Sequence, residues 1–322
     1  MAGRRQGRGA WKSRKLGEKI AFSITSALIA LVALACGLIT YSETLDKPFL
    51  PTWDEIFGMA GMTDQPMDSR LQVDILDVGN ADAILVRNQG VNLLIDAGEN
   101  NDGDLVVQEL RSRSISRLDY VIATHPDADH IGGMDVVVEN MEIGTFLMSF
   151  MPEGATPTTK TYLDMLEALD SKGVAVTEAE PGQTYALGDA RLDILGPVEP
   201  SEDTNNNSVV CKVTFGSQRF LFMGDAEKEE EDSLLASGAD LRAEFIKLGH
   251  HGSNSSSQKE FLEAVSPTYA AITCGTGNSY GHPHTETLQT LEELQITYAR
   301  SDLNGTVKLS SDGSSIAVAT ER

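Results

Sequence analysis

All six histidines of this 322-residue chain lie in three close pairs, and each pair follows a short apolar run. The pairs are His125 with His130, His250 with His251, and His282 with His284. Histidines that are buried singly in a hydrophobic core, each with its own hydrogen bond, would be scattered along the sequence. Core packing therefore explains this grouping poorly. The preceding runs, "LDYVIAT", "EFIKLG" and "YAAITCG", are typical of buried strands. Loops at strand ends are where α/β folds place their sites, so the pattern predicts an α/β fold with polar residues at its strand ends.

The first pair lies in the densest polar stretch, "ATHPDADHIGG", at residues 123–133. Burying four such ionisable groups without compensation would be costly. His125, Asp127 and Asp129 alternate, which would place them on one side of an extended turn, with His130 facing another way. This geometry could supply two metal positions, one from His125 with Asp127 and one from Asp129 with His130. Helix capping is an alternative role for one of the aspartates, but it does not explain both histidines.

Two glycines follow the two histidines of this stretch, and a further carboxylate that could bind metal lies later in the sequence. Gly132 and Gly133 lack side chains, so we expect the next segment to pack close to bound ions. Asp225 ends the apolar run in "QRFLFMGDAE", just before an expected helix at 226–237. At that position it could bridge two divalent ions. Capping of the helix is the alternative for so short a motif.

The first 70 residues differ in composition from the rest. Residues 1–19 hold seven basic residues and one acidic residue, and residues 20–41 hold no charge. About 20 apolar residues can span a bilayer, and the basic flank would stay in the cytoplasm. We therefore expect a basic cytoplasmic tail (1–19), a transmembrane anchor (20–41), a linker (42–70) and an extracellular catalytic domain (71–322). A cleaved signal peptide, or a lipoprotein signal that acylates Cys36, is the alternative.

From residue 71 onward, strand and helix patterns alternate. "LQVDILDV" and "AILVRNQGVNLLID" predict a strand followed by a hairpin. The three cysteines show no paired spacing, which argues against a disulfide framework or a zinc ribbon. One α/β domain is the simplest interpretation. After the hairpin and an amphipathic stretch near 102–115, the expected helices lie at 158–171, 226–237, 257–265 and 284–295.

Seven short segments, in this order, resemble the metallo-β-lactamase superfamily. More narrowly, they resemble the hydrolase domain at the C-terminus of ComEC, the competence DNA-uptake channel. The segments are "LDVGNADAILV", "NLLIDAG", "THPDADHIGG", "NNNSVV", "FLFMGDAE", "IKLGHHGSN" and "YGHPH". The resemblance covers about residues 71–322 and implies an αββα sandwich. The N-terminal 70 residues depart from it, since ComEC has a multi-helix channel and this chain has one apolar segment.

The resemblance also implies a site for two divalent ions. Its metal ligands would be His125, Asp127, Asp129, His130, Asp225, and His250 or His251. Asn207 and Ser208 stand near the position where the superfamily normally has a further histidine. Fewer imidazoles and more oxygens tilt the preference away from zinc. The expected ions are Mn²⁺ or Zn²⁺, with Mg²⁺ also possible.

By the same resemblance, the reaction would be phosphodiester hydrolysis assisted by two ions about 3.5–4 Å apart. Asp129 would orient the nucleophile, and His282 or His284 would protonate the leaving oxygen. Other polar residues are expected to orient ligands or to contact substrate, although solvated loop positions explain Lys247 and Ser253 equally well. These residues are Asp82, Asn207, Ser208, Lys247 and Ser253.

The leading functional hypothesis is a nuclease that cleaves DNA at the cell surface, with the membrane and nucleic acid as partners and no obligate protein partner. The negative charge of the chain argues against DNA as the substrate. Residues 20–322 hold 18 basic and 47 acidic residues, a net charge of −29, whereas nonspecific DNA binding depends on Lys and Arg. The alternative is a smaller phosphodiester, such as a cell-wall choline or lipid-headgroup ester. A metal-stabilised binding module is less consistent with so many carboxylates, because closed structural sites use mostly Cys and His.

Overall fold

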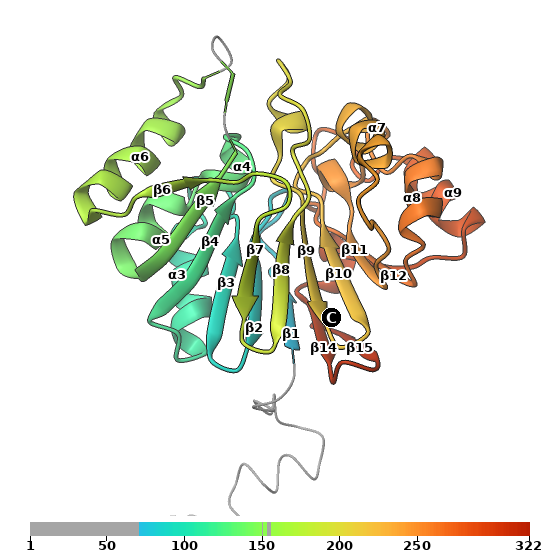
Figure 1. Ribbon diagram of the computed structural model, residues 1–322, viewed down its shortest axis with the longest axis horizontal. Coiled ribbons are helices and arrows are strands. Elements are labelled where there is room, and N and C mark those ends of the chain that lie inside the picture. Colours follow the sequence, from blue (N-terminus) through green and yellow to red (C-terminus); the bar gives the residue numbers. More distant parts are fainter. Residues whose placement is uncertain (1–70, 150, 153–155) are drawn as a thin grey trace, which may run out of the picture. The chain divides into compact units, whose positions relative to one another are not determined.

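The computed structural model describes residues 71–149, 151–152 and 156–322. The predicted tail, anchor and linker at 1–70 lie outside the described residues. None of the helices within the described ranges has the length and apolarity needed to cross a membrane. The described residues form two β-sheets with helices on their outer faces (Figure 1), so the predicted two-sheet α/β architecture is confirmed.

The first sheet has eight strands and changes from antiparallel to parallel at β3. The predicted hairpin is present between β2 and β3, with Gln89 and Gly90 both at positive φ in its turn. In spatial order the strands are β15 (Ile316–Thr320), β14 (Val307–Ser311), β1 (Leu71–Ile75), β2 (Ile84–Asn88), β3 (Val91–Ile95), β4 (Arg117–Ala123), β5 (Glu142–Met148) and β6 (Val176–Glu178).

The second sheet has seven strands, antiparallel from β7 to β10 and parallel from β10 to β13. In spatial order they are β13 (Thr297–Arg300), β12 (Tyr269–Ile272), β11 (Phe245–Lys247), β10 (Gln218–Phe222), β9 (Cys211–Phe215), β8 (Ala190–Ile194) and β7 (Thr184–Leu187).

Three apolar layers hold the domain together. The central layer lies between the sheets and includes Val73, Leu93, Phe220 and Phe245. The outer layers pack under helices on opposite sides of the sandwich, as Figure 1 shows. The first sheet is covered by α3 (Gly103–Ser112), α5 (Met134–Asn140) and α6 (Lys160–Lys172), and the second by α7 (Lys228–Ser237), α8 (Lys259–Val265) and α9 (Thr285–Glu293). The short helical turns are α4 (Ala128–Ile131), α10 (Ser301–Asn304), η1 (Asn205–Asn207) and η2 (Gly249–Gly252).

The parallel halves of both sheets position the site. Strands β3 to β6 run parallel in the first sheet, and β10 to β13 run parallel in the second. Ligands of such sheets bind beyond the carboxyl ends of the strands. The three histidine pairs follow β4, β11 and β12, which are strands of these parallel halves.

The two glycines after the first histidine pair pack against backbone. A Cβ on Gly133 would meet the carbonyl oxygen of Ala97 and lie 2.6 Å from the amide nitrogen of Gly103. A Cβ on Gly132 would meet the amide nitrogen of Asn100. The close approach that the structure shows is between this pair and the backbone of residues 97–103, and it fixes where α4 lies. Close packing of the next segment against bound ions stays a prediction.

Two glutamates on α7 are buried and hold neighbouring loops. Glu230 accepts a hydrogen bond from the Val198 amide (2.9 Å), and Glu231 accepts one from the Gln258 amide (3.0 Å). Burial raises the pKa of Glu230 to about 8 and that of Glu231 to about 7. The folded protein thus binds protons that the unfolded chain releases near pH 4.5. Their contribution to stability is complete below that pH and is lost as the pH rises through about 7–8.

We expect Glu230→Gln to be neutral for stability at pH 5 and stabilising by ~2–4 kcal/mol at pH 9, because an amide accepts the Val198 bond without ionising. Urea unfolding at both pH values measures the difference from the unmodified protein. Glu229→Gln, an exposed neighbour on the same helix, is the control and should change little at either pH. An equal effect of Glu230→Gln at both pH values would contradict the burial argument.

Candidate metal centre

Four side chains from both sheets converge at the carboxyl ends of the parallel strands. Asp129 and His130 lie on α4 after β4, Asp225 follows β10, and His251 lies on η2 after β11. One nitrogen or oxygen from each lies within 4.8 Å of those of the other three. Three of the four residues are buried, and the Asp129 side chain is 27% exposed. The cluster can therefore hold a metal ion and still be reached from solvent.

Asp225 lies between two imidazoles from opposite sheets. Its Oδ1 is 3.1 Å from Nε2 of His130, and its Oδ2 is 3.4 Å from Nε2 of His251. The same His251 nitrogen is 3.2 Å from Oδ2 of Asp129. Each carboxylate oxygen of Asp225 thus faces a different histidine, which is the geometry that a bridging ligand needs.

The Nδ1 atoms of His130 and His251 are hydrogen-bonded to residues behind the cluster. Nδ1 of His130 is 2.7 Å from Oδ2 of Asp96, and Nδ1 of His251 is 2.9 Å from the carbonyl oxygen of Thr273. Asp96 is itself fixed by the backbone and hydroxyl of Thr124. A ring that donates through Nδ1 presents the lone pair of Nε2 to a metal. These partners were not expected from the sequence.

Two further histidines flank the four. His125 is buried, and its ring centroid lies 4.1 Å from that of His130. His250 places Nε2 3.9 Å from Oδ2 of Asp225, and its Nδ1 is 2.7 Å from Oε1 of Glu227. Glu227 therefore orients His250 as Asp96 orients His130, a role that was not predicted from the sequence.

Strained backbone is concentrated at this site. Asp96, His250 and His251 have φ values of 60°, 46° and 53°. For residues other than glycine, this left-handed conformation costs about 1 kcal/mol or more each, and it persists where surrounding contacts impose it. The contacts of the cluster supply that constraint.

The residues present fit divalent ions. Three buried atoms here have no hydrogen-bond partner of suitable geometry among the described residues: Nε2 of His125, Nε2 of His130 and Oδ1 of Asp225. Leaving buried polar atoms unpaired is costly. Imidazole nitrogens and carboxylate oxygens are ligands of zinc and manganese, so bound ions would satisfy all three atoms.

The charges of three side chains at this site suit metal binding. Burial opposes ionisation of Asp225, yet His251 and His130 hold its pKa well below the usual range. Burial also opposes ionisation of Asp129, but its hydrogen bond to His251 lowers its pKa to about 2. Burial and the neighbouring His130 lower the pKa of His125 to about 3. These three side chains are therefore in the deprotonated form that metal ligands require.

Asp127 lies apart from the four converging side chains. It is an exposed residue and accepts a hydrogen bond from Oγ1 of Thr204 at 3.3 Å. The extended turn expected from the alternation of 125, 127 and 129 is not what the structure shows, because α4 begins at Ala128. The helical twist turns Asp129 and His130 toward the cluster and leaves Asp127 at the N-cap position, without a capping hydrogen bond.

Asp82 and Lys247 form a buried ion pair beside the cluster. Asp82 also accepts a hydrogen bond from Oγ1 of Thr273, which lies 3.2 Å from Nδ1 of His251. Asp82 is thus linked to His251 through the hydroxyl group of Thr273. Lys247 is fully buried and also lies 3.5 Å from the carbonyl oxygen of Gly224. Its side chain therefore supports the residues behind the cluster and has no exposed surface with which to contact a substrate phosphate.

The remaining expected residues fall into two groups. Oγ of Ser208 accepts a hydrogen bond from the Asp225 amide at 3.0 Å and lies 3.4 Å from Nδ1 of His125, so it supports the cluster. Asn207 uses its amide to shape the loop at 201–203, and Ser253 bonds to Ser255. Within the described part of the chain, no hydrogen bond joins either of these two residues to one of the four clustered side chains.

The third histidine pair lies beside the cluster. The ring of His282 is 5.2 Å from that of His250, and burial lowers its pKa to about 4. Nδ1 of His284 accepts the Asn254 amide hydrogen at 2.9 Å, which places the proton of the neutral ring on Nε2. Tyr280 is 68% exposed and stacks on His282.

We expect Asp225→Asn to weaken Mn²⁺ and Zn²⁺ binding by about 100-fold or more, because the amide removes the charge shared by both histidines. Asp127→Asn should change it by less than about tenfold. Calorimetric titration of chelator-stripped protein measures both, and circular dichroism checks that each variant is folded. Equal losses in the two variants would contradict the assignment of the centre to the four converging side chains.

The comparisons with known proteins agree with this geometry. Residues 76–275 match the Metallo-beta-lactamase superfamily. The chain is 30% identical over 261 residues to "ComE operon protein 3" of Bacillus subtilis and 30% identical over 292 residues to "Competence protein ComA" of Neisseria gonorrhoeae. It is 26% identical over 286 residues to "Recombination protein 2" of Haemophilus influenzae.

These alignments cover 75%, 90% and 86% of this chain but only 33%, 38% and 31% of the three relatives. The chain thus spans about a third of the length of the curated relatives it matches. The resemblance to the superfamily and to its competence-protein branch, inferred from the motifs, is confirmed. The two-sheet fold, the cluster at its strand ends and the match over 76–275 agree, and the chain belongs to the metallo-β-lactamase superfamily of metal-dependent hydrolases.

Proposed function

We propose that this hydrolase is a phosphodiesterase that cleaves DNA. The observation that carries the proposal is the mixed carboxylate and imidazole cluster, in which Asp225 lies between His130 and His251. Such a set suits two divalent ions more than a single structural zinc. The likeness of the motifs to the hydrolase domain of ComEC, the competence DNA-uptake channel, and the similarity to the competence proteins named above support DNA as the substrate.

Bound divalent ions would supply an acidified water and would neutralise charge on the phosphoryl oxygens. His125, His130, Asp225 and His251 would hold them, with Asp129 at the solvent side. Asp129 is the most exposed of the four clustered carboxylates and imidazoles. It is therefore placed to orient the attacking water as well as to ligate.

Of the two candidate acids, His284 has the better arrangement. A general acid must carry a proton at the working pH, whereas burial lowers the pKa of His282 to about 4. The bond that Nδ1 of His284 accepts from Asn254 places the N–H of the neutral ring at Nε2, where it can donate a hydrogen bond to the leaving oxygen. Full transfer of a proton from His284 would require a second proton on this ring. His282 would then shape the wall between His284 and His250.

Charge favours a second candidate function. Residues 20–322 carry a net charge of −29, and nonspecific DNA binding depends on Lys and Arg. A smaller phosphodiester with a cationic group, such as a cell-wall choline or lipid-headgroup ester, would tolerate this surface. The proposed membrane anchor at 20–41 would hold the enzyme at the cell surface in either case, and this part of the proposal rests on the sequence alone.

We expect the metal-stripped full chain to cleave single- or double-stranded DNA only after reloading, and most actively with Mn²⁺, because the ligand set is rich in oxygen. Asp129→Ala should lower the rate by about 100-fold or more. Asp104→Ala, at an exposed position on α3, is the control and should retain the full rate. Gel assays with Mn²⁺, Mg²⁺ and Zn²⁺ measure these rates. Turnover of a bis-aryl phosphodiester without DNA cleavage would favour the headgroup-ester candidate.

A further inference from the structure

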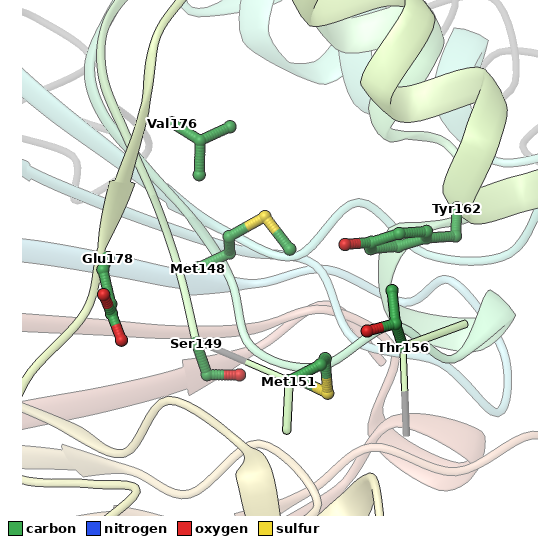
Figure 2. A pocket seen from close by; sticks show the side chains of 7 residues that line it. All are labelled: Met148, Ser149, Met151, Thr156, Tyr162, Val176 and Glu178. Carbon is green, nitrogen blue, oxygen red and sulfur yellow. The ribbon is translucent and has the colours of Figure 1, made fainter. Parts of the chain in front are cut away.

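A cavity of about 320 Å³ lies at the carboxyl ends of β5 and β6, next to α6 (Figure 2). Its walls include Met148 and Ser149 at the end of β5, Tyr162 on α6, and Val176 and Glu178 on β6. This volume is within the range of small-ligand sites. The metal ligands described above do not line it.

The cavity adjoins the metal centre. Met148 is the register partner of Ala123, two residues before His125. A narrow void of about 10 Å³ is lined by His125 and Pro126 together with Met148, Ser149 and Tyr162, which also line the cavity. A ligand in the cavity would therefore lie beside the wall that holds His125. This shared wall is the reason for placing one residue of a polymer in the cavity and its neighbouring phosphate at the metals.

The lining selects against phosphate itself. The seven described side chains that line it include no Lys, Arg or His, and one of them is the carboxylate of Glu178. The thioethers of Met148 and Met151 and the ring of Tyr162 offer soft, apolar surface, which suits a flat aromatic ring. Aromatic side chains that stack on bases support single-strand binding in many proteins.

The cavity also holds an unsatisfied hydrogen-bonding group. Ser149 is 3% exposed, and its Oγ has no hydrogen-bond partner among the described residues. A buried hydroxyl without a partner is costly. The hydroxyl can donate to or accept from the edge of a base, and the carboxylate of Glu178 can accept from an exocyclic amino group.

We propose that this cavity binds a nucleobase of the strand whose phosphate lies at the metal centre. The inference deepens the proposed DNA cleavage and rests on it for the identity of the substrate. A flat ring would pack against Met148, Met151 and Tyr162 and hydrogen-bond to Ser149. A base held there must be unstacked, so the enzyme would act on single strands or on strand ends. A quaternary ammonium group is the competing occupant, but such groups are bound by several aromatic rings, and among the described residues that line the cavity Tyr162 is the only aromatic one.

The direct test is a binding measurement that requires neither metal nor cleavage. Full-length protein labelled at the methionine methyl groups is titrated with thymidine, 2′-deoxycytidine, choline or inorganic phosphate and followed by NMR. We expect the nucleosides to shift the methyl signals of Met148 and Met151, and to leave that of Met223, in the core of the second sheet, unchanged. No shift with any nucleoside, or a shift with choline alone, would overturn the inference.

A variant that fills the cavity gives the second arm. Val176 is 44% exposed on the edge strand β6, so Val176→Trp should block the cavity without disturbing the core. Leu163→Trp, at a 52% exposed position on α6 outside the lining, is the matched control. Val176→Trp should abolish the nucleoside shifts and lower kcat/KM for single-stranded DNA by about tenfold or more. The control should do neither.

The two proposals can fail separately. Nucleoside shifts that Val176→Trp abolishes, in a protein that cuts no DNA, would keep the cavity assignment and remove the nuclease proposal. DNA cleavage by Val176→Trp at the rate of the unmodified protein would keep the nuclease and overturn the cavity assignment. Melting curves of both tryptophan variants confirm that each is folded.

Discussion

The site depends on one carboxylate placed between histidines from two different sheets. Asp225, after β10, faces His130 from the first sheet and His251 from the second. Burying this group is favourable only with opposite charge close by. Strands of both sheets must therefore end at the same place. The loop after β3 must also pack closely against Gly132 and Gly133, because this contact positions α4 and His130.

Behind this contact, hydrogen-bond partners set which nitrogen of each histidine faces the centre. Asp96 holds His130, Thr273 holds His251, and Glu227 holds His250. The Asp82–Lys247 pair holds Thr273 in turn. The rest of the domain is strongly acidic, so a phosphate is attracted only where bound ions reverse the sign of the local charge. Metal would thus serve both chemistry and substrate binding.

Much of this arrangement could be predicted from local patterns. The helices expected at 226–237 and 257–265 begin and end within two residues of α7 and α8, because apolar periodicity and turn residues mark them. Strands β7 and β13 were not predicted, since "TYAL" and "TYAR" are only four residues long and incompletely buried. Asp96 was missed because its role depends on a residue 34 positions away. The place of Asp127 was not foreseen because alternation suggested an extended turn where α4 begins.

The most direct test of the account is to locate the ions. Crystals of protein loaded with Mn²⁺ would be measured on both sides of the manganese absorption edge. The account predicts anomalous peaks within bonding distance of Asp225, one toward His130 and His125 and one toward His251 and Asp129. Peaks confined to the acidic surface, or an empty position at Asp225, would contradict it.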